Sequence, residues 1–377
     1  MLQKFKVRYF AGFDREITLD LSNPKNYAFQ PQCITNDGII RAAVVHGING
    51  VGKSNLGLAL FDIFKNLTDY SGAPEIYPPY LCADRPQDIE AAEFEYTFRL
   101  KGCTLIYKYS KRSLTEIVSE SLSINGKQVV EFDRSEGNTQ FSTLLKGTEH
   151  LNATLTSTSV SVLKYIKSNT QRPDTPHNLA FNALFDFVNN MLFYKCLDLK
   201  AYISAPLDTN SITLEIIRAN AVDQLQDFLY KAGIPTHLIV EGEGDQRRIM
   251  NIYNREILPL LSVTSTGTDA LLLFFCWLLR IRRAGVSLLF IDEFDAFYHF
   301  KLSRHIISML RDTIGLQFIL TTHNPANISN FLLRPDCYFI MDRSGLSSLS
   351  SRTPKELREA HNIEKMYKAS GFNIPID

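Results

Sequence analysis

One short segment constrains the fold of this chain more than any other, a glycine-rich loop between an apolar run and an amphipathic run. RAAVVHG at 41–47 is typical of a buried strand, and SNLGLALFDIF at 54–64 has the periodicity of a helix. Between them, residues 47–54 read GINGVGKS and fit the pattern G-x-x-x-x-G-K-[ST]. A strand, a tight loop and a helix in this order predict an α/β core with the loop at one edge of the sheet.

The residues of this loop have the chemistry of a phosphate-binding site. Glycines let backbone N–H groups wrap closely around phosphates at the start of a helix, where the helix dipole favours an anion. We expect Lys53 to hold the charge of the β- and γ-phosphates and the Ser54 hydroxyl to be a ligand of magnesium. The predicted cofactors are therefore ATP and Mg²⁺. The alternative is an ordinary glycine turn, which would leave the flanking strand and helix unexplained.

A second apolar strand ends in two carboxylates. The segment SLLFIDEFD spans 287–295. A buried strand that ends in Asp-Glu is costly unless the carboxylates have partners. We expect Asp292 to bind the magnesium, directly or through water, and Glu293 to be the general base that polarises the attacking water. The alternative is a strand whose polar end simply reaches solvent.

A third apolar strand, in the segment FILTTHNP at 318–325, ends in a histidine. This strand is predicted to lie beside the Asp-Glu strand, so His323 would face the same edge of the sheet. A neutral imidazole there can contact the γ-phosphate or the attacking water. A lone histidine is more often a surface residue, but the shared edge favours a catalytic role for His323.

In this order the three motifs resemble those of the ABC-type ATPases of the SMC/RecF/OLD group. GINGVGKSN at 47–55 is close to the G-x-N-G-x-G-K-S-N form of that group, and DEFDA at 292–296 resembles its second acidic motif. The likeness adds Asn49, Gly50, Gly52 and Asn55 to the predicted nucleotide-binding residues.

The resemblance also implies a signature loop shortly before the acidic strand. Ser265-Thr266-Gly267-Thr268 stands at that place and opens an apolar helix. In relatives such a Ser and Gly face the γ-phosphate bound by the other subunit, so Ser265, Gly267 and Thr268 are predicted to complete the site of a partner copy. Taken alone, the same four residues could be a helix N-cap in which Ser265 or Thr268 is the capping side chain.

A closer resemblance is to the compact AAA15/AAA21-like ATPases of bacterial phage-defence and abortive-infection loci. It is carried by the N-terminal FKVRYFAGFDREITLDLS, by LQDFLYKAGIPTHLIVE and NREILPLLSVTSTGTDALL, and by the tail LREAHNIEKMYKASGFNIP. It implies a homodimer or higher homo-oligomer that acts as an ATP-driven switch and controls a separate effector protein, a toxin or a nuclease. Two features depart from the wider group: His299 replaces an aspartate that relatives usually carry, and Gln87 is a glutamine-loop candidate by position only.

The predicted fold class is therefore α/β, an ABC-type P-loop ATPase head with a mixed sheet, an N-terminal antiparallel β subdomain and a mostly helical insertion. Alternation of apolar and polar residues from 92 to 130 predicts the antiparallel sheet, with a hairpin turn at 124–126. Segments 178–192 and 222–233 are predicted helices of the insertion. We expect an N-terminal ATPase lobe at 1–135, the insertion at 136–235, a C-terminal ATPase lobe at 236–350 and a helical tail at 351–377.

Composition limits the class of protein. Forty Lys and Arg balance forty Asp and Glu, so nothing demands a nucleic-acid partner, although a local basic patch could exist. The six cysteines lack CxxC or zinc spacing, which suits a reducing compartment. The N-terminus has no apolar signal core, and the longest apolar run, 270–279, is about half of the roughly 20 residues that a membrane span needs. We expect a soluble, cytoplasmic protein that does not bind membranes.

Other function classes remain to be compared. A RecF-like ATPase that clamps DNA in repair or recombination fits the same nucleotide motifs, with 111–112 and 280–283 as basic groups that could contact phosphates. IVEGEGD at 239–245 is similar to the start of a Toprim nuclease but lacks a later D-x-D of its own. A transporter motor would normally carry a glutamine loop and an LSGGQ-like signature, and neither is clear.

Overall fold

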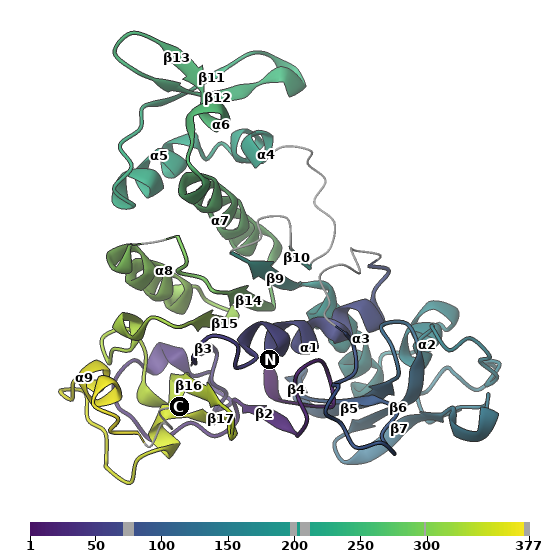
Figure 1. Ribbon diagram of the computed structural model, residues 1–377. Coiled ribbons are helices and arrows are strands. Elements are labelled where there is room, and N and C mark those ends of the chain that lie inside the picture. Colours follow the sequence, from purple (N-terminus) through teal and green to yellow (C-terminus); the bar gives the residue numbers. More distant parts are fainter. Residues whose placement is uncertain (71–78, 197–201, 204–211, 298, 373–377) are drawn as a thin grey trace.

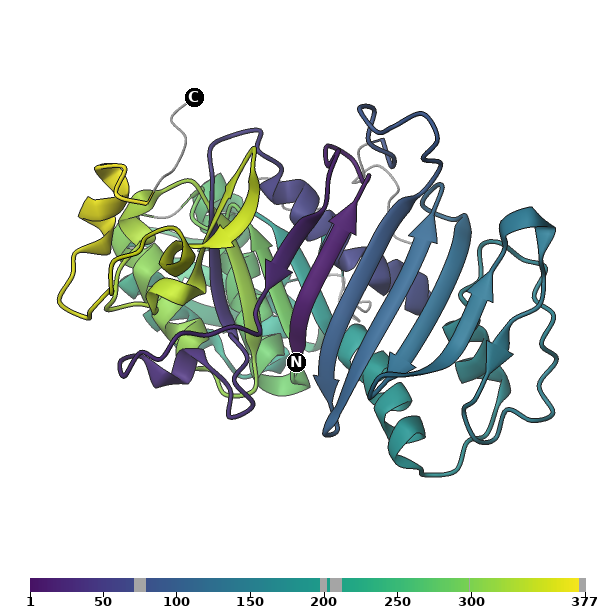
Figure 2. The same cartoon turned by 90° about the horizontal axis from the view of Figure 1, so that it is seen from below.

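Two sheets of the computed structural model face each other across one buried helix, α1 (Lys53–Leu67), as Figures 1 and 2 show. The structure describes residues 1–70, 79–196, 202–203, 212–297 and 299–372. Twelve of the fifteen α1 residues are buried. A helix that is apolar on nearly every side must be covered on every side. One sheet therefore packs against each face of α1.

The first sheet carries the motifs. Its order in the described chain is β10-β9-β14-β15-β3-β16-β17, and the five central strands run parallel. Every residue of β3, β14 and β15 is buried, as expected for parallel strands covered on both faces. The strands are β3 (Ala42–His46), β9 (Met191–Lys195), β10 (Tyr202–Ile203), β14 (Leu288–Asp292), β15 (Gln317–Thr322), β16 (Tyr338–Asp342) and β17 (Gly345–Ser348).

Strand β9 differs from the sequence-based prediction. Met191 and Leu192 were expected to end a helix, but helix α3 (Pro176–Asn189) stops at its C-cap Asn190 and the chain enters β9. Strand β9 then pairs in parallel with β14. The predicted insertion at 136–235 therefore contains helices but also supplies β9 and β10 to the main sheet. The apolar run after Asn190 is short and fully buried, and a buried strand and a buried helix end have the same pattern at that length.

The second sheet is antiparallel, as the alternation at 92–130 predicts. Its order is β2-β1-β4-β5-β6-β7-β8. Asn125 and Gly126 both have positive φ, 51° and 79°, which is the backbone that a two-residue hairpin between β6 and β7 requires. The strands are β1 (Leu2–Arg8), β2 (Ile17–Asp20), β4 (Ala92–Leu100), β5 (Cys103–Lys111), β6 (Ile117–Ile124), β7 (Lys127–Asp133) and β8 (Ser142–Thr143).

A small third sheet, β11-β12-β13, stands at the far end of α7 from the two large sheets (Figure 1). Helices α7 (Thr266–Ala284) and α8 (Phe300–Asp312) precede and follow β14 in the chain. The remaining elements are α2 (Val162–Asn169), α4 (Ile212–Arg218), α5 (Val222–Lys231), β11 (Leu238–Glu241), β12 (Arg248–Ile252), β13 (Ile257–Pro259), α6 (Leu260–Val263) and α9 (Ile363–Lys368). Only α9 is an α-helix among the described residues of the predicted helical tail.

The six cysteines are buried and free. Among the described residues, none of the helices combines the length and the apolar character that a membrane span would need.

Polar contacts fix α1 to the antiparallel sheet. Asp62 of α1 is completely buried, and the Lys111 ammonium of β5 lies 2.9 Å from its Oδ1. The hydroxyls of Tyr80 and Tyr109 donate to the same carboxylate at 3.0 and 2.9 Å. A buried carboxylate is tolerated only when such partners replace water. The sheet therefore holds the helix that follows the glycine-rich loop by charge as well as by apolar packing.

This buried pair predicts a large stability difference between two lysines of β5. Lys111→Met leaves Asp62 without its cation and should lower the free energy of unfolding by about 3–5 kcal/mol. Lys108→Met, on the exposed face of the same strand, removes an ion pair with Glu95 at 2.8 Å and should cost less than about 1 kcal/mol. Urea denaturation followed by tryptophan fluorescence measures both. Equal costs for the two variants would contradict the role of the Asp62–Lys111 pair.

Candidate functional site

The glycine-rich loop and the acidic motif, far apart in sequence, meet at the carboxyl ends of β3 and β14. The Ser54 hydroxyl donates to Oδ2 of Asp292 at 2.6 Å, across a sequence separation of 238 residues. Strand β15 lies between β3 and β14 and runs parallel to both, so all three strands end at the same edge. The order of the parallel strands is therefore what brings the two motifs together.

The glycine-rich loop leaves β3 and starts α1. Gly50 and Gly52 have φ of 79° and 104°, a backbone region that glycine adopts without strain. A side chain at Gly52 would also come within 2.7 Å of the Phe13 ring. The Lys53 ammonium turns back into the loop and donates to the carbonyl oxygens of Gly47 and Ile48 at 2.8 and 2.9 Å. Burial lowers the pKa of Lys53, and the nearby Glu293 and Asp292 oppose that shift.

Thr321 of β15 holds the two carboxylate residues together. Its hydroxyl donates to Oδ1 of Asp292 at 2.6 Å and accepts from the backbone N–H of Glu293 at 2.7 Å. Glu293 has a φ of 48°, a left-handed backbone that costs a residue other than glycine about 1–3 kcal/mol. The sequence analysis did not select Thr321. Two threonines end this strand, and the pattern alone does not show which one faces β14.

A cavity of about 210 Å³ lies over the loop and is lined by Asn49, Gly50, Gly52, Lys53, Ser54, Asn55 and Glu293. A second cavity of about 400 Å³ shares Asn49 and Gly50 with it. Its other walls are the turn between β1 and β2, Asp84 and the Asp342–Arg343 pair. Six predicted loop residues and the predicted base therefore line one space. Ile48 and Val51 of the glycine-rich loop also line the second cavity.

The residues present fit a magnesium ion shared with a phosphate group. Ser54 and Asp292 offer two oxygen ligands that already touch each other. Mg²⁺ prefers one or two protein oxygens together with phosphate oxygens and water, rather than a cage made by the protein alone. The described residues contain no cluster of three or more His, Cys, Asp or Glu side chains that could hold a metal by themselves. In the segment 239–245, Asp245 pairs with Arg218 at 2.7 Å.

Two histidines lie near the loop and differ in burial. His323 follows β15 and is exposed, at the same edge of the sheet as Ser54 and Asp292. His46 ends β3 and is 1% exposed, and neither of its ring nitrogens has a hydrogen-bond partner among the described residues. The ring centres of Tyr338 and Tyr367 each lie 6.0 Å from the centre of the His46 ring. Burial, and then the positive charges of Lys53 and His323, lower the pKa of His46 to about 3.

The predicted signature residues lie at the N-terminus of α7 and outside the cavity over the loop. Ser265 is the N-cap, and its hydroxyl accepts from the Thr268 N–H at 3.3 Å. A Cβ atom on Gly267 would have the carbonyl oxygen of Phe297 as its nearest neighbour, at 3.8 Å. These residues therefore do not complete the nucleotide cavity of their own chain. The nearby His299 is the N-cap of α8, where its Nδ1 accepts from the Lys301 N–H at 3.5 Å.

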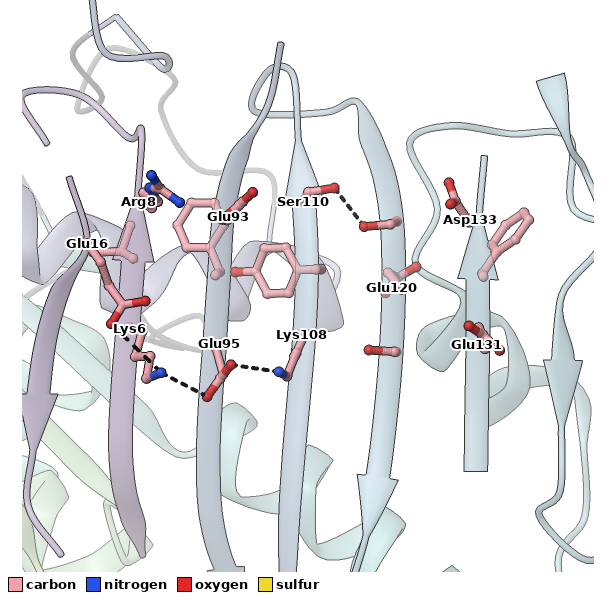
Figure 3. Close-up of a pocket in the computed structure, with 16 residues that line it drawn as sticks. Lys6, Arg8, Glu16, Glu93, Glu95, Lys108, Ser110, Glu120, Glu131 and Asp133 are labelled. Atoms are coloured by element: carbon pink, nitrogen blue, oxygen red, sulfur yellow. Dashed lines mark hydrogen bonds and ion pairs between the residues drawn. The ribbon is translucent and has the colours of Figure 1, made fainter. Parts of the chain in front are cut away.

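A third cavity of about 420 Å³ lies on the outer face of the antiparallel sheet, away from every motif (Figure 3). Its charges pair across neighbouring strands: Glu95 of β4 lies between Lys6 of β1 at 3.7 Å and Lys108 of β5 at 2.8 Å. Ser110 and Ser119 share a hydrogen bond of 2.7 Å beside them. This arrangement is that of a solvated sheet face, and we assign no ligand to it.

The buried His46 predicts a pH dependence of stability. Its folded pKa lies below its unfolded value, so the unfolded chain binds the proton between pH 6.5 and pH 3, and stability falls as the pH drops through that window. When the pH is lowered from 7 to 5, the free energy of unfolding should fall by about 2 kcal/mol more in the wild type than in His46→Leu. The slope for one extra proton bound by the unfolded chain is about 1.36 kcal/mol for each pH unit. Chemical denaturation of both proteins at the two pH values measures this. Equal losses would show that His46 is protonated or solvated in the fold.

Comparison with known proteins agrees with the predicted relation. Residues 148–329 match the AAA_21 family model, described as an AAA domain, putative AbiEii toxin, type IV TA system. The matched segment contains the signature residues, β14 and β15, whereas the glycine-rich loop lies before it. No curated protein matches the chain.

Three solved structures are similar to the chain at low sequence identity and with TM-scores below 0.5. One is the SMC head domain from Thermotoga maritima, 14% identical, covering 94% of this chain and 99% of that chain with a TM-score of 0.43. A second is the SmcHead bound to the C-winged helix domain of ScpA, at 14% identity, 93% and 98% coverage and a TM-score of 0.45. The third is an Smc head domain with an extended coiled coil bound to the C-terminal domain of ScpA derived from Pyrococcus furiosus. It is 11% identical, covers 93% of this chain and 97% of that chain, and has a TM-score of 0.45.

The loop–strand geometry and the matched segment lead to one conclusion. Residues 148–329 are similar to the AAA_21 ATPases, and the strand, glycine-rich loop and helix before them have the arrangement of a phosphate-binding loop.

Proposed function

We propose that this protein binds ATP with Mg²⁺ in the cavity over the glycine-rich loop and hydrolyses it, as a dimeric switch that controls an effector protein. The observation that carries the proposal is the 2.6 Å contact between Ser54 of the loop and Asp292 of the acidic motif. A hydroxyl and a carboxylate in contact beside a phosphate loop are the ligand set expected for nucleotide-bound magnesium.

The two cavities, which share Asn49 and Gly50 as walls, each hold part of the nucleotide. The triphosphate occupies the 210 Å³ cavity, where the loop amides and the Lys53 ammonium face its negative charge. To do so, Lys53 exchanges its present contacts with Gly47 and Ile48 for phosphate oxygens. The nucleoside occupies the 400 Å³ cavity beside the turn between β1 and β2.

The hydrolysis step uses Glu293, which lines the 210 Å³ cavity, and His323, which follows β15. Glu293 accepts a proton from the attacking water, whose oxygen bonds to the γ-phosphorus while the bridging bond breaks and leaves its electron pair on ADP. His323 lies at the same edge of the sheet and contacts the γ-phosphate or the water. When bound, Mg²⁺ neutralises phosphate charge and is held by Ser54 and Asp292.

A second copy of the chain completes the site. Ser265 and Gly267 stand at the start of an apolar helix of 19 residues, and neither lines the loop cavity of its own chain. A helix N-terminus with a free face is suited to an anion. In the proposed dimer, Ser265, Gly267 and Thr268 of one copy face the γ-phosphate held by Lys53 of the other.

The biological role follows from the family relation. The matching model is described by reference to a putative AbiEii toxin of a type IV toxin–antitoxin system. This supports a switch that holds or releases a toxin or nuclease in bacterial phage defence. A stable complex between the purified protein and the product of a neighbouring gene is the expected finding, and its absence for every neighbour would count against this role.

The alternative is a RecF-like ATPase that binds DNA through two basic groups, 111–112 and 280–283. The first of these groups is not free to contact DNA. Lys111 is 1% exposed and paired with Asp62, so it cannot reach a DNA phosphate. Arg112 pairs with Glu90 at 2.9 Å and with Glu116 at 3.2 Å. In the second group, the guanidinium of Arg280 lies 5.6 Å from the centre of the Trp277 ring. Arg282 and Arg283 of the same group are exposed.

Mixing two inactive variants tests the shared site. Lys53→Ala removes the phosphate contact, and Ser265→Arg blocks the signature, so each variant alone should hydrolyse no ATP. A mixed dimer contains one intact site, made by the loop of Ser265→Arg and the signature of Lys53→Ala. An equimolar mixture should therefore regain roughly a quarter of the wild-type rate, since about half of the dimers are mixed and each has one site of two. Phosphate release is the measurement.

An active Ser265→Arg variant, or a mixture that stays inactive, would contradict the two-chain site. The same assay with duplex DNA at low salt separates the two roles. Hydrolysis that DNA does not change is expected for a switch regulated by protein, whereas strong stimulation by DNA that fades as salt rises would favour the RecF-like role.

A further inference from the structure

Thr321 occupies an unusual position at the end of the pairing between β14 and β15. The parallel pairing of the two strands ends at Ile291 and Leu320. The next residue of β15, Thr321, contacts three successive residues, the last residue of β14 and the two that follow it. Its hydroxyl bonds Asp292 and Glu293, as described above, and its carbonyl oxygen accepts from the N–H of Phe294 at 3.1 Å.

These contacts set the direction in which the chain leaves β14. Glu293 has a φ of 48°, and its carbonyl oxygen accepts from the N–H of Ala296 at 3.0 Å, so the chain turns sharply there. Because of this turn, Glu293 lines the cavity over the loop together with Lys53 and Ser54 instead of continuing the strand. A left-handed backbone at a residue other than glycine persists only where its surroundings hold it.

The same hydroxyl also orients Asp292. This side chain is 0% exposed, and its two oxygens have different partners: Oδ1 accepts from Thr321, and Oδ2 accepts from Ser54. With Oδ1 held by Thr321, Oδ2 points toward α1. One buried hydroxyl thus fixes both carboxylate residues relative to the loop.

We propose that Thr321 is a positioning residue for ATP hydrolysis, whose hydroxyl holds Asp292 toward Ser54 and holds the backbone turn that brings Glu293 into the loop cavity. This inference rests on the proposed function. It assigns Thr321 no contact with nucleotide or metal, and its effect passes through Asp292 and Glu293.

The test compares substitutions that keep or remove the hydroxyl. Thr321→Val keeps the branched shape but removes the donor and the acceptor, and Thr321→Ser keeps the hydroxyl. Thr148→Val is the matched control, because Thr148 is also buried and its hydroxyl donates to the Leu145 carbonyl at 2.6 Å, away from the site. Thr321→Ala replaces Thr321→Val if the latter does not fold.

Two readouts are needed, one of which does not depend on turnover. In Thr321→Val, kcat should fall about 10–100-fold while KM for ATP changes less than about threefold, because the reacting groups are misplaced but the loop is intact. In the nucleotide-free protein, hydrogen exchange at the Glu293 and Phe294 amides should be faster than in wild type. Thr321→Ser and Thr148→Val should resemble wild type in both readouts.

A Thr321→Val protein whose kcat matches that of Thr148→Val would overturn the inference and leave the proposed function intact. Unchanged exchange at Glu293 and Phe294 would overturn it too. A wild type that hydrolyses no ATP would overturn the proposed function, and the exchange readout would still decide whether Thr321 holds the turn.

Discussion

The carboxylate of Asp292 is the group on which the site depends. It is completely buried, and each of its oxygens accepts a hydrogen bond of 2.6 Å from a hydroxyl on a different element, Ser54 of α1 and Thr321 of β15. A buried carboxylate without such donors would cost several kcal/mol. Strands β14 and β15 must therefore end, and helix α1 must start, at the same edge of the sheet and at the same level along the strands. The parallel order of β14, β15 and β3 meets that requirement.

Helix α1 connects the Asp292 site to both large sheets. Its first turn contacts Asp292 through Ser54, and two turns later Asp62 is paired with Lys111 of the antiparallel sheet. On the opposite side, a Cβ atom at Gly57 would come within 2.5 Å of the Phe290 ring of β14, so the helix lies directly on the parallel sheet. A helix fixed on both faces cannot shift alone. A change of nucleotide state that moved the N-terminus of α1 would therefore act on both sheets together.

Much of the site could be predicted because its motifs are local. A glycine loop between a strand and a helix, and a buried strand that ends in Asp292 and Glu293, are visible without knowledge of the fold. The order of the three motifs gave the resemblance to the SMC/RecF/OLD ATPases, and the AAA_21 match over 148–329 agrees with the predicted relation to AAA21-like ATPases. The antiparallel sheet was predictable because its residues alternate between a buried and an exposed face.

The rest depends on contacts that a single sequence does not show. Strand β9 was assigned to a helix end because its apolar run has no period of its own, and only its pairing with β14 makes it a strand. Lys111 looked like part of a basic surface, but strand alternation places it inside, against Asp62. Thr321 and His46 carry no motif, and their importance comes from their neighbours, Asp292 for the one and the tyrosine rings for the other.

The most direct test of an Asp292-centred magnesium site is calorimetric titration of ATP into wild type and Asp292→Asn, with Mg²⁺ and with EDTA. The amide keeps the shape of the side chain and removes the charge. Wild type should bind ATP more tightly with Mg²⁺ than with EDTA. Asp292→Asn should bind ATP like wild type in EDTA and gain nothing from Mg²⁺. An Asp292→Asn protein that keeps the full gain from Mg²⁺ would show that the metal is held elsewhere.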